Sequence, residues 1–300
     1  MQEDWEIRPK LLAATLALRT EYYLFTGWNH QPTVRLLLTP SARHSFWGAW
    51  SRSVRVPARG EIDGSGLATV YGPGAAGPLP LAIEVISNPD LMNERGDSFE
   101  SGYRGQLTRR VVADTAFFVA HHRGGLGFQP NKPVVRFLGQ SPYVYLPLTY
   151  SNQTDVDSLG WESSLRYAIS NNLQVTGAYS WLHFLRIASR IPGSPIDSSE
   201  LVATSPAHQF QVQAQWRPAR RWECDLAYFL YTPRINAQPD QLIPRHRADL
   251  RIGWHFSETA ELSAGVQNLT GGNRYEFVIA RGPAQAPTQP AAYLRLSFRF

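Results

Sequence analysis

Apolar and polar residues alternate one by one along much of this chain. In residues 210–217, Phe210, Val212, Ala214 and Trp216 are separated by three glutamines and followed by an arginine. Successive side chains of an extended strand point to opposite faces, so this pattern predicts a strand with one apolar and one polar face. Related patterns predict twelve strands, at residues 11–23, 33–39, 44–55, 97–107, 111–122, 158–169, 173–186, 207–217, 222–231, 246–256, 261–268 and 291–300.

The connections between these predicted strands are alternately short and long. Short polar turns are expected at 40–43, 108–110, 170–172, 218–221 and 257–260. Longer segments rich in Gly, Pro, Asn and Ser lie at 24–32, 56–96, 123–157, 187–206, 232–245 and 269–290. We therefore predict an all-β, antiparallel, up-and-down transmembrane β-barrel, with short periplasmic turns and long extracellular loops.

A soluble β-sandwich is the alternative fold, because its strands also alternate. Sandwich strands usually have five or six residues, and a sandwich has no reason to separate short turns from long loops. Aromatic residues near predicted strand ends, such as Tyr22, Trp28, Trp181 and Trp222, suit the interfacial girdle of a membrane protein. The barrel is therefore the favoured fold.

Composition narrows the choice of partners. The chain has 29 basic and 24 acidic residues, a net charge of +5, which fits either a mildly basic surface or a lumen that attracts anions. No basic run with interleaved aromatic residues is present, so no nucleic-acid partner is predicted. Cys224, the single cysteine, is expected to be a small apolar residue of its strand.

The sequence offers no pattern typical of an enzyme. His121 and His122 are adjacent and should face opposite sides of a strand, and no helix-spaced metal motif, nucleophile elbow or Walker loop is present. No catalytic residue, metal site or cofactor is predicted. An outer-membrane enzyme is kept as an alternative of a different class.

The C-terminal segment resembles the TonB-dependent receptor family of outer-membrane proteins. Residues 260–277 are similar to the penultimate strand of those receptors, and residues 291–300 to their closing strand. The matching residues of the first are Gln267, Asn268, Leu269, Tyr275 and Glu276. In the second, the resemblance implies that Tyr293, Leu294, Leu296, Phe298 and Phe300 form the signal read by the barrel assembly machinery.

Two upstream segments carry the same resemblance. Residues 32–61 are similar to a hairpin that leads into an Arg-x-Pro motif, here Arg55 and Pro57. Residues 87–104 resemble the element that follows it in the family, with Asn88, Pro89, Glu94, Glu100 and Gly102 as the matching residues. The resemblance thus extends over essentially all 300 residues.

The resemblance implies a receptor larger than this chain. Complete members have about 22 strands around a plug domain that TonB engages, whereas twelve strands, no plug domain and no signal peptide are expected here. The acidic residues Glu3, Asp4 and Glu6 precede the apolar segment 11–18, where a signal peptide would be basic. We therefore expect residues 1–300 to be the C-terminal part of the barrel, a fragment not competent alone.

Ligand-binding residues are not identified by the sequence, but five arginines are candidates for the lumen wall. Their alternative role is pairing with acids such as Glu100, Glu162 and Asp249, or with a plug. A histidine typical of haem receptors is absent from residues 58–87. The candidate lumen residues are Arg104, Arg166, Arg217, Arg247 and Arg251.

The resemblance implies a multi-pass barrel in the Gram-negative outer membrane, in contact with lipid. Its expected function is TonB-dependent uptake of a scarce nutrient such as a ferric siderophore, with TonB acting only through a plug. A passive pore or a structural outer-membrane barrel is the alternative.

Overall fold

The computed structural model describes residues 1–74, 77–189, 205–232, 245–270 and 289–299. These residues form one 16-stranded sheet and one short helix, α1 (Arg59–Asp63). No described helix has the length and apolar character needed to cross a membrane. The strands are β1 (Gln2–Arg8), β2 (Leu12–Tyr23), β3 (Gly27–Ser41), β4 (His44–Arg55), β5 (Ser65–Tyr71), β6 (Leu81–Ile86), β7 (Glu94–Gln106), β8 (Val111–Pro130), β9 (Val134–Leu138), β10 (Ser141–Ala168), β11 (Leu173–Ser189), β12 (His208–Ala219), β13 (Trp222–Tyr231), β14 (Arg245–His255), β15 (Ala260–Gln267) and β16 (Ala291–Phe298).

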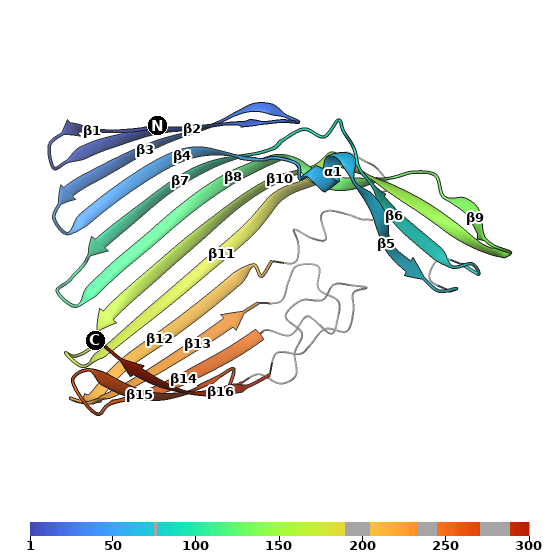
Figure 1. The fold of residues 1–300 in the computed structure, drawn as a ribbon. Coiled ribbons are helices and arrows are strands. Elements are labelled where there is room, and N and C mark those ends of the chain that lie inside the picture. The colour runs from blue at the N-terminus through green and yellow to red at the C-terminus, as the bar shows by residue number, and fades with distance from the viewer. Residues whose placement is uncertain (75–76, 190–204, 233–244, 271–288, 300) are drawn as a thin grey trace.

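The sheet is an up-and-down wall that is not closed. Its main path runs in sequence order from β1 to β16, and every pair of neighbours along it is antiparallel. β5, β6 and β9 lie off this path, so thirteen of the sixteen strands form the wall. Figure 1 shows the wall as a curved trough with β1 at one edge and β16 at the other.

The prediction of twelve strands was too low. The structure adds β1, whose alternation is hidden by its acidic residues, and β5, β6 and β9, which lie inside segments predicted as long loops. β10 also begins at Ser141, well before the predicted start at residue 158. The predicted short turns lie between the expected strands, for example between β7 and β8 and between β10 and β11.

One face of the wall carries a continuous row of aromatic side chains. Phe117, Trp161, Tyr179 and Phe210 come from four successive strands, with ring centroids 5.8, 5.5 and 4.8 Å apart along the row. Phe117 is 53% exposed and Phe210 is 43% exposed. We call this the apolar face and the opposite side, which carries the glutamines of β12, the polar face. Exposed aromatic rings on a continuous surface need an apolar environment to cover them.

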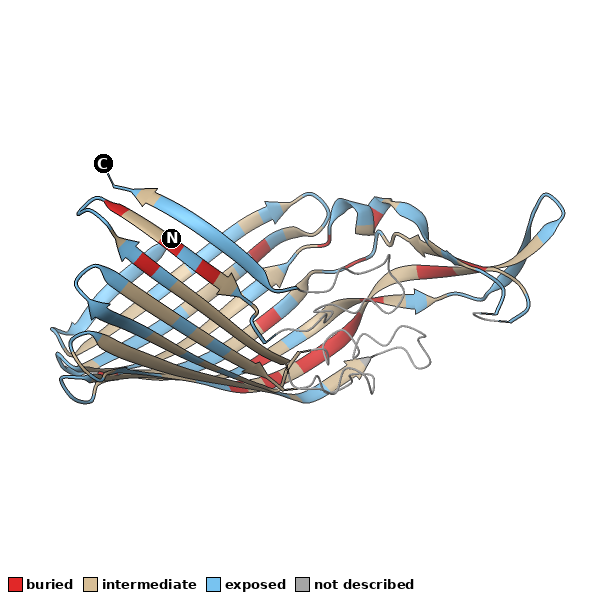
Figure 2. Ribbon diagram, turned by 90° about the horizontal axis from the view of Figure 1, so that it is seen from below, coloured by how far each residue is buried: buried red, intermediate tan, exposed pale blue. Residues whose placement is uncertain are grey.

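The described residues do not form the compact core of a globular domain. Its accessible surface is 19491 Å², against roughly 12,700 Å² for a folded monomer of this mass. Figure 2 shows few buried positions along the wall, in keeping with this excess. The soluble β-sandwich is therefore excluded, because its two sheets would cover each other's apolar faces.

A small extension projects from the long-loop end of the wall (Figure 1). There β6 pairs in parallel with the first part of β10, while β5 pairs with β6 and β9 pairs with β10. Leu148 of β10 is 1% exposed, and Leu81 and Ile62 are also buried. The parallel pair is the exception to the predicted antiparallel sheet. Most of the buried apolar side chains lie in or near this extension, so it has a small core of its own.

Candidate functional site

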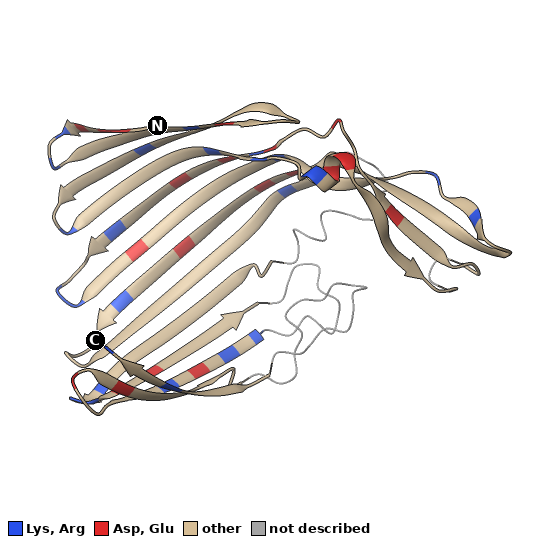
Figure 3. Cartoon of the chain, in the orientation of Figure 1, with Lys and Arg blue, Asp and Glu red and all other residues tan. Residues whose placement is uncertain are grey.

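The polar face carries ion pairs that link neighbouring strands. Figure 3 shows basic and acidic residues interspersed along β14 and the strands beside it. Arg251 of β14 lies directly opposite Asp225 of β13, and its Nη1 is 2.6 Å from the Asp225 carboxylate. The same nitrogen lies 3.2 Å from Glu223, and Nη2 pairs with Glu261 of β15. One guanidinium therefore links three strands through three carboxylates.

A second pair lies toward the long-loop end of the same strand. Arg247 contacts Asp249 through two nitrogens, at 2.9 and 2.7 Å, and its guanidinium carbon lies 5.5 Å from the Phe229 ring centroid. Asp249 also accepts the backbone N–H of Asn268 at 2.9 Å. Asn268 has a φ of 58°, a left-handed conformation that asparagine tolerates well, so it ends β15 at this point.

The predicted lumen arginines are thus mostly committed to acids. Arg104 pairs with Asp114 at 2.5 Å, and Arg217 lies 3.4 Å from Glu223. Of the acids expected as partners, Asp249 is a partner, whereas Glu100 accepts a hydrogen bond from Ser98. The sequence analysis missed Asp114, Glu223, Asp225 and Glu261, because the strand register decides which acid meets which arginine.

Arg166 differs from the other four candidates. It is exposed on the polar face of β10, between Val112 and Thr176 of the neighbouring strands. Within the described part of the chain no ion pair to Arg166 is found. Of the five predicted lumen arginines it is the one whose charge no carboxylate of the described residues pairs with.

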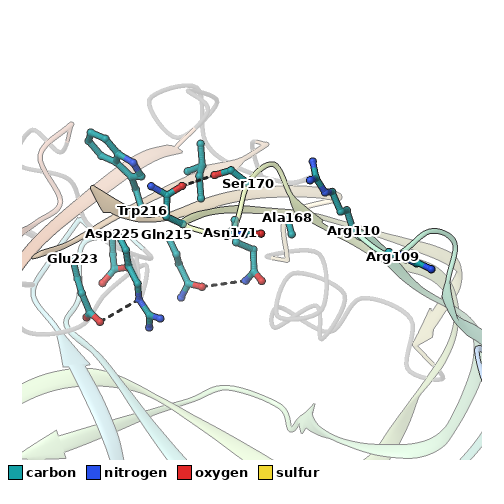
Figure 4. A pocket seen from close by; sticks show the side chains of 13 residues that line it. Arg109, Arg110, Ala168, Ser170, Asn171, Gln215, Trp216, Glu223 and Asp225 are labelled. Atoms are coloured by element: carbon teal, nitrogen blue, oxygen red, sulfur yellow. Dashed lines mark hydrogen bonds and ion pairs between the residues drawn. The ribbon is translucent and has the colours of Figure 1, made fainter. Parts of the chain in front are cut away.

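A hollow of about 590 Å³ lies at the short-turn end of the polar face. Arg109 and Arg110 come from the turn before β8, Asn171 from the turn before β11, and Gln215 from β12. Figure 4 shows Gln215, Glu223 and Asp225 pointing to the same side of the sheet, with Trp216 directed to the other. Gln174 donates to Gln215 at 3.1 Å, which joins β11 to β12 across this surface. The hollow is polar and carries charges of both signs.

The Arg-x-Pro motif forms a joint at the opposite end of the wall. Arg55 contacts Glu94 and Glu61, each at 2.6 Å, and Glu61 accepts the N–H of Ala58 at 2.8 Å. Partial burial of Arg55 lowers its pKa, but the ion pairs with Glu61 and Glu94 outweigh burial and raise that pKa. Pro57 is buried beside this joint. The arginine thereby fixes α1 to β4 and β7.

The Asn-Pro segment joins the same structure. Asn88 accepts the N–H of Asp90 and donates to the carbonyl of Tyr150, each at 2.9 Å, while its own N–H donates to the Glu61 carbonyl. Pro89 follows directly. The Glu94 carboxylate accepts the N–H of Leu126 at 3.0 Å. These motif residues thus link α1, β7, β8 and β10.

Other motif residues shape the wall itself. A Cβ added at Gly102 would lie 2.5 Å from the Trp47 indole, so glycine leaves room for that ring. Leu269 donates its N–H to the Ala248 carbonyl at 2.8 Å, directly after Gln267 and Asn268. On β16, Leu294, Leu296 and Phe298 are exposed on the apolar face, and the Tyr293 ring lies over Gly265. Tyr275, Glu276 and Phe300 lie outside the described residues.

No group of three or more His, Cys, Asp and Glu side chains within the described ranges has the arrangement of a metal site. His121 and His122 do face opposite sides of β8, opposite Asp97 and Gly96 respectively.

Comparison with known proteins places this geometry in a family. The family model described as TonB dependent receptor-like, beta-barrel, matches residues 1–269. No curated protein shows significant sequence similarity to the chain.

Solved structures share the fold at low sequence identity. A mutant of the ferric enterobactin receptor PfeA from Pseudomonas aeruginosa is 17% identical, with a TM-score of 0.74, and the match covers 100% of this chain and 44% of PfeA. The siderophore receptor PirA from Acinetobacter baumannii is 15% identical, with a TM-score of 0.68, and the match covers 90% of this chain and 40% of PirA. The copper transporter OprC is 12% identical, with a TM-score of 0.60, and the match covers 96% of this chain and 45% of OprC.

This chain spans less than half the length of each of these structures. The family match over most of the chain and the open, up-and-down wall agree with the resemblance seen in the sequence. The chain belongs to the TonB-dependent receptor family, as part of its β-barrel.

Proposed function

We propose that this chain is the C-terminal part of an outer-membrane receptor barrel that takes up a scarce nutrient, with a ferric siderophore as the nutrient. The family is one of transporters rather than enzymes, and its outer-membrane location supports the same location here. Structural neighbours named as siderophore receptors support the choice of ligand class.

One observation carries this proposal: an open wall whose apolar face is exposed across four successive strands. In a bilayer this face contacts hydrocarbon, and the polar face lines a lumen. The unpaired backbone groups at β1 and β16 would cost several kcal/mol each in lipid. The wall therefore works as one part of a barrel that other strands complete.

The strand count specifies what completes it. Thirteen strands pair antiparallel along the path, so β1 and β16 run in the same direction. Fully antiparallel closure then requires an odd number of further strands, the outermost of which run opposite to β1 and β16. A second copy in the same membrane orientation would meet each edge in parallel, so it is a poor partner.

The polar face is the proposed path for the ligand. Ferric chelates that carry negative charge would be attracted by the accessible guanidinium of Arg166. The ion pairs of Arg104, Arg217, Arg247 and Arg251 reduce their attraction for an anion. We propose that these four chiefly hold the wall together, while Arg166 contributes to ligand attraction.

Two protein partners belong to this proposal. The exposed apolar residues of β16, ending at Phe300, would be read by the barrel assembly machinery. TonB would act through a plug domain, which the described strands do not include. No nucleic-acid partner is proposed.

Uptake by a hybrid receptor tests the function. The chain would replace the corresponding C-terminal barrel part of a siderophore receptor such as PfeA, and labelled ferric siderophore would be followed in iron-starved cells with and without TonB. Energy-dependent uptake by the hybrid, lost without TonB, is the expected result. A hybrid that reaches the outer membrane but admits small solutes equally with and without TonB would favour the passive pore.

A further inference from the structure

The apolar face changes character abruptly toward the long-loop end. Trp50, Phe99, Val119 and Leu159 lie directly opposite one another on β4, β7, β8 and β10. Two residues further along each strand, the next row on the same face is charged. That row consists of Arg52, Asp97, His121 and Asp157, and Arg186 lies opposite Asp157 after a bulge in β11.

A second charged row follows, in which Arg95 and Arg123 are directly opposite each other. We call the two rows together the basic belt. Its residues are Arg52, Arg95, Asp97, His121, Arg123, Asp157 and Arg186. Like charges directly opposite each other are usually avoided between strands, so the Arg95–Arg123 pair depends on nearby negative charge, part of which Asp97 and Asp157 supply.

Ion pairs hold the belt in place without covering it. Arg52 and Arg95 each lie 2.9 Å from the Asp97 carboxylate. Arg123 lies 2.6 Å from Asp157, and His121 lies 2.9 Å from the same carboxylate. The side chains of Arg95 and Arg123 still remain 48% and 40% exposed. Both guanidinium groups therefore keep donors for a further acceptor.

The belt has more cations than anions. Its four arginines face the carboxylates of Asp97 and Asp157. Asp155, one row further out on β10, is buried and accepts the N–H of Gly124 at 3.0 Å. Even with Asp155 included, four arginines meet three carboxylates, so the surface attracts anions.

A shallow hollow of about 490 Å³ joins the belt to the apolar row. Trp50 and Phe99 line its apolar side, and its charged side, with three arginines and one carboxylate, is lined by Arg52, Arg95, Asp97, His121 and Arg123. The guanidinium carbon of Arg52 lies 5.5 Å from the centroid of the Trp50 ring. The hollow thus offers an apolar surface beside a cationic one, the arrangement that an amphiphile requires.

The distance of the belt from the short-turn end of the wall matches the thickness of the apolar part of a bilayer. On β8, ten residues from Val111 to Ala120 precede His121. Ten residues tilted by about 45° rise roughly 24 Å along the membrane normal. This is close to the apolar band of about 25 Å expected for an outer-membrane barrel. The belt therefore lies at the headgroup level of the leaflet on the long-loop side.

We propose that the basic belt binds the phosphate groups of a phosphorylated lipid in the outer leaflet. Arginines match phosphate oxygens through paired N–H donors, and the adjacent aromatic row would contact the acyl chains. A nutrient in the lumen is a poor candidate, because the belt lies on the face opposite the lumen arginines. This inference rests on the proposed membrane placement.

Binding of lipid A tests the inference, with this chain carried in the hybrid receptor described above and purified in dodecyl maltoside micelles. Native mass spectrometry would measure the retention of diphosphorylated lipid A, and of the form with a single phosphate. The belt variant carries Arg52→Gln, Arg95→Gln and Arg123→Gln. The matched control, Arg104→Gln with Arg166→Gln and Arg217→Gln, removes the same charge from the polar face.

The belt variant should bind the diphosphorylated lipid roughly tenfold more weakly or worse, because each lost contact is charge-assisted. The matched control should stay within about twofold. Asp97→Asn should instead strengthen binding, because it releases Arg52 and Arg95. This second variant keeps the test decisive if the belt variant fails to fold.

Equal loss in the belt variant and the matched control overturns the inference, as does unchanged or weaker binding by Asp97→Asn. Insertion into neutral phosphatidylcholine vesicles, which carry no net charge, distinguishes failure of the lipid-binding inference from failure of the proposed function. A hybrid receptor that inserts into neutral vesicles but ignores lipid phosphate refutes only the belt. A hybrid receptor that does not associate with any vesicle, although the unmodified siderophore receptor does, refutes the membrane placement itself.

Discussion

Val212→Arg tests the assignment of the two faces most sharply. Val212 lies on β12 between Phe210 and Trp216, directly opposite Gly177 on one side and Tyr228 on the other. It is 48% exposed on the apolar face. If this face contacts lipid, the substitution places a guanidinium near the middle of the hydrocarbon.

The expected cost is about 2–4 kcal/mol for arginine near the bilayer midplane of a barrel. At 1.36 kcal/mol for each factor of ten, this is roughly a 30-fold to 900-fold loss in the folding equilibrium. The arginine side chain can extend toward the interface, which favours the lower part of this range.

The matched control is Gln213→Arg on the polar face. Gln213 lies opposite Thr176 and Ala227, in a row that also contains Asp249. The added charge should remain hydrated, and the change in the free energy of unfolding should stay within about 0.5 kcal/mol.

Urea titration of the hybrid receptor from lipid vesicles would measure both variants, with gel migration and trypsin protection as the readout. Val212→Arg should lose insertion well before Gln213→Arg. Equal losses, or a larger loss for Gln213→Arg, would refute the assignment of the faces.

Three further predictions concern single contacts. Arg251→Ala leaves Glu223, Asp225 and Glu261 without their shared cation, and should lower the free energy of unfolding by about 1–3 kcal/mol in urea titration. Arg166→Ala should change the free energy of unfolding by less than about 0.5 kcal/mol. Equal losses for Arg166→Ala and Arg251→Ala would contradict a stabilising role of the Arg251 ion pairs. Gly102→Ala should cost about 1–3 kcal/mol because its Cβ would overlap the Trp47 ring. Gly177→Ala, where no atom lies within 4 Å, is the control, and a similar cost there would disprove the packing argument. The hydrogen bond from Tyr145 to Glu84 raises the pKa of Tyr145 above its usual value, about 10. The contribution of this hydrogen bond to stability is present below about pH 10 and is lost as the pH rises through the raised pKa of Tyr145. Proteolysis of β5 and β6 in the natural chain should therefore increase above that pKa. Tyr145→Phe should abolish that dependence, and an unchanged pH profile would contradict the role of this contact.

Alternation located most strands of the wall because one face of the wall is apolar and the other polar, so successive residues alternate in polarity. In β1, Glu3 shares the apolar face with Trp5, opposite Leu16 and Ala14 of β2, so no clean alternation is visible there. The extension was missed for a different reason. β6 is paired with β5 on one side and with β10 on the other, and its sequence LAIEVI has no regular alternation.

The candidate site depended more heavily on register. Residue type and spacing place Arg251 on a polar face, but the alignment of β13, β14 and β15 decides that Glu223, Asp225 and Glu261 surround it. The family resemblance singled out Arg55 and Glu94 separately. That they form an ion pair depends on the pairing of β4 with β7, two strands that 38 residues separate.

The basic belt had a signal in the sequence that went unused. Arg52 follows Trp50, and His121 follows Val119, at the spacing of one strand face. Each charge alone resembles an ordinary strand end. Their alignment into rows appears only when four strands are placed side by side.

The central claim is that this chain forms an open wall of a receptor barrel, which other strands complete. Cross-linking in outer membranes tests it most directly, in a chain whose single cysteine is removed by Cys224→Ser. New cysteines would be introduced as pairs between β1 and β16, for example Asp4→Cys with Arg295→Cys or with Ser297→Cys. The account predicts no disulfide between β1 and β16 at any register. Efficient formation of such a disulfide within one chain would show that the wall closes by itself, and would contradict the account.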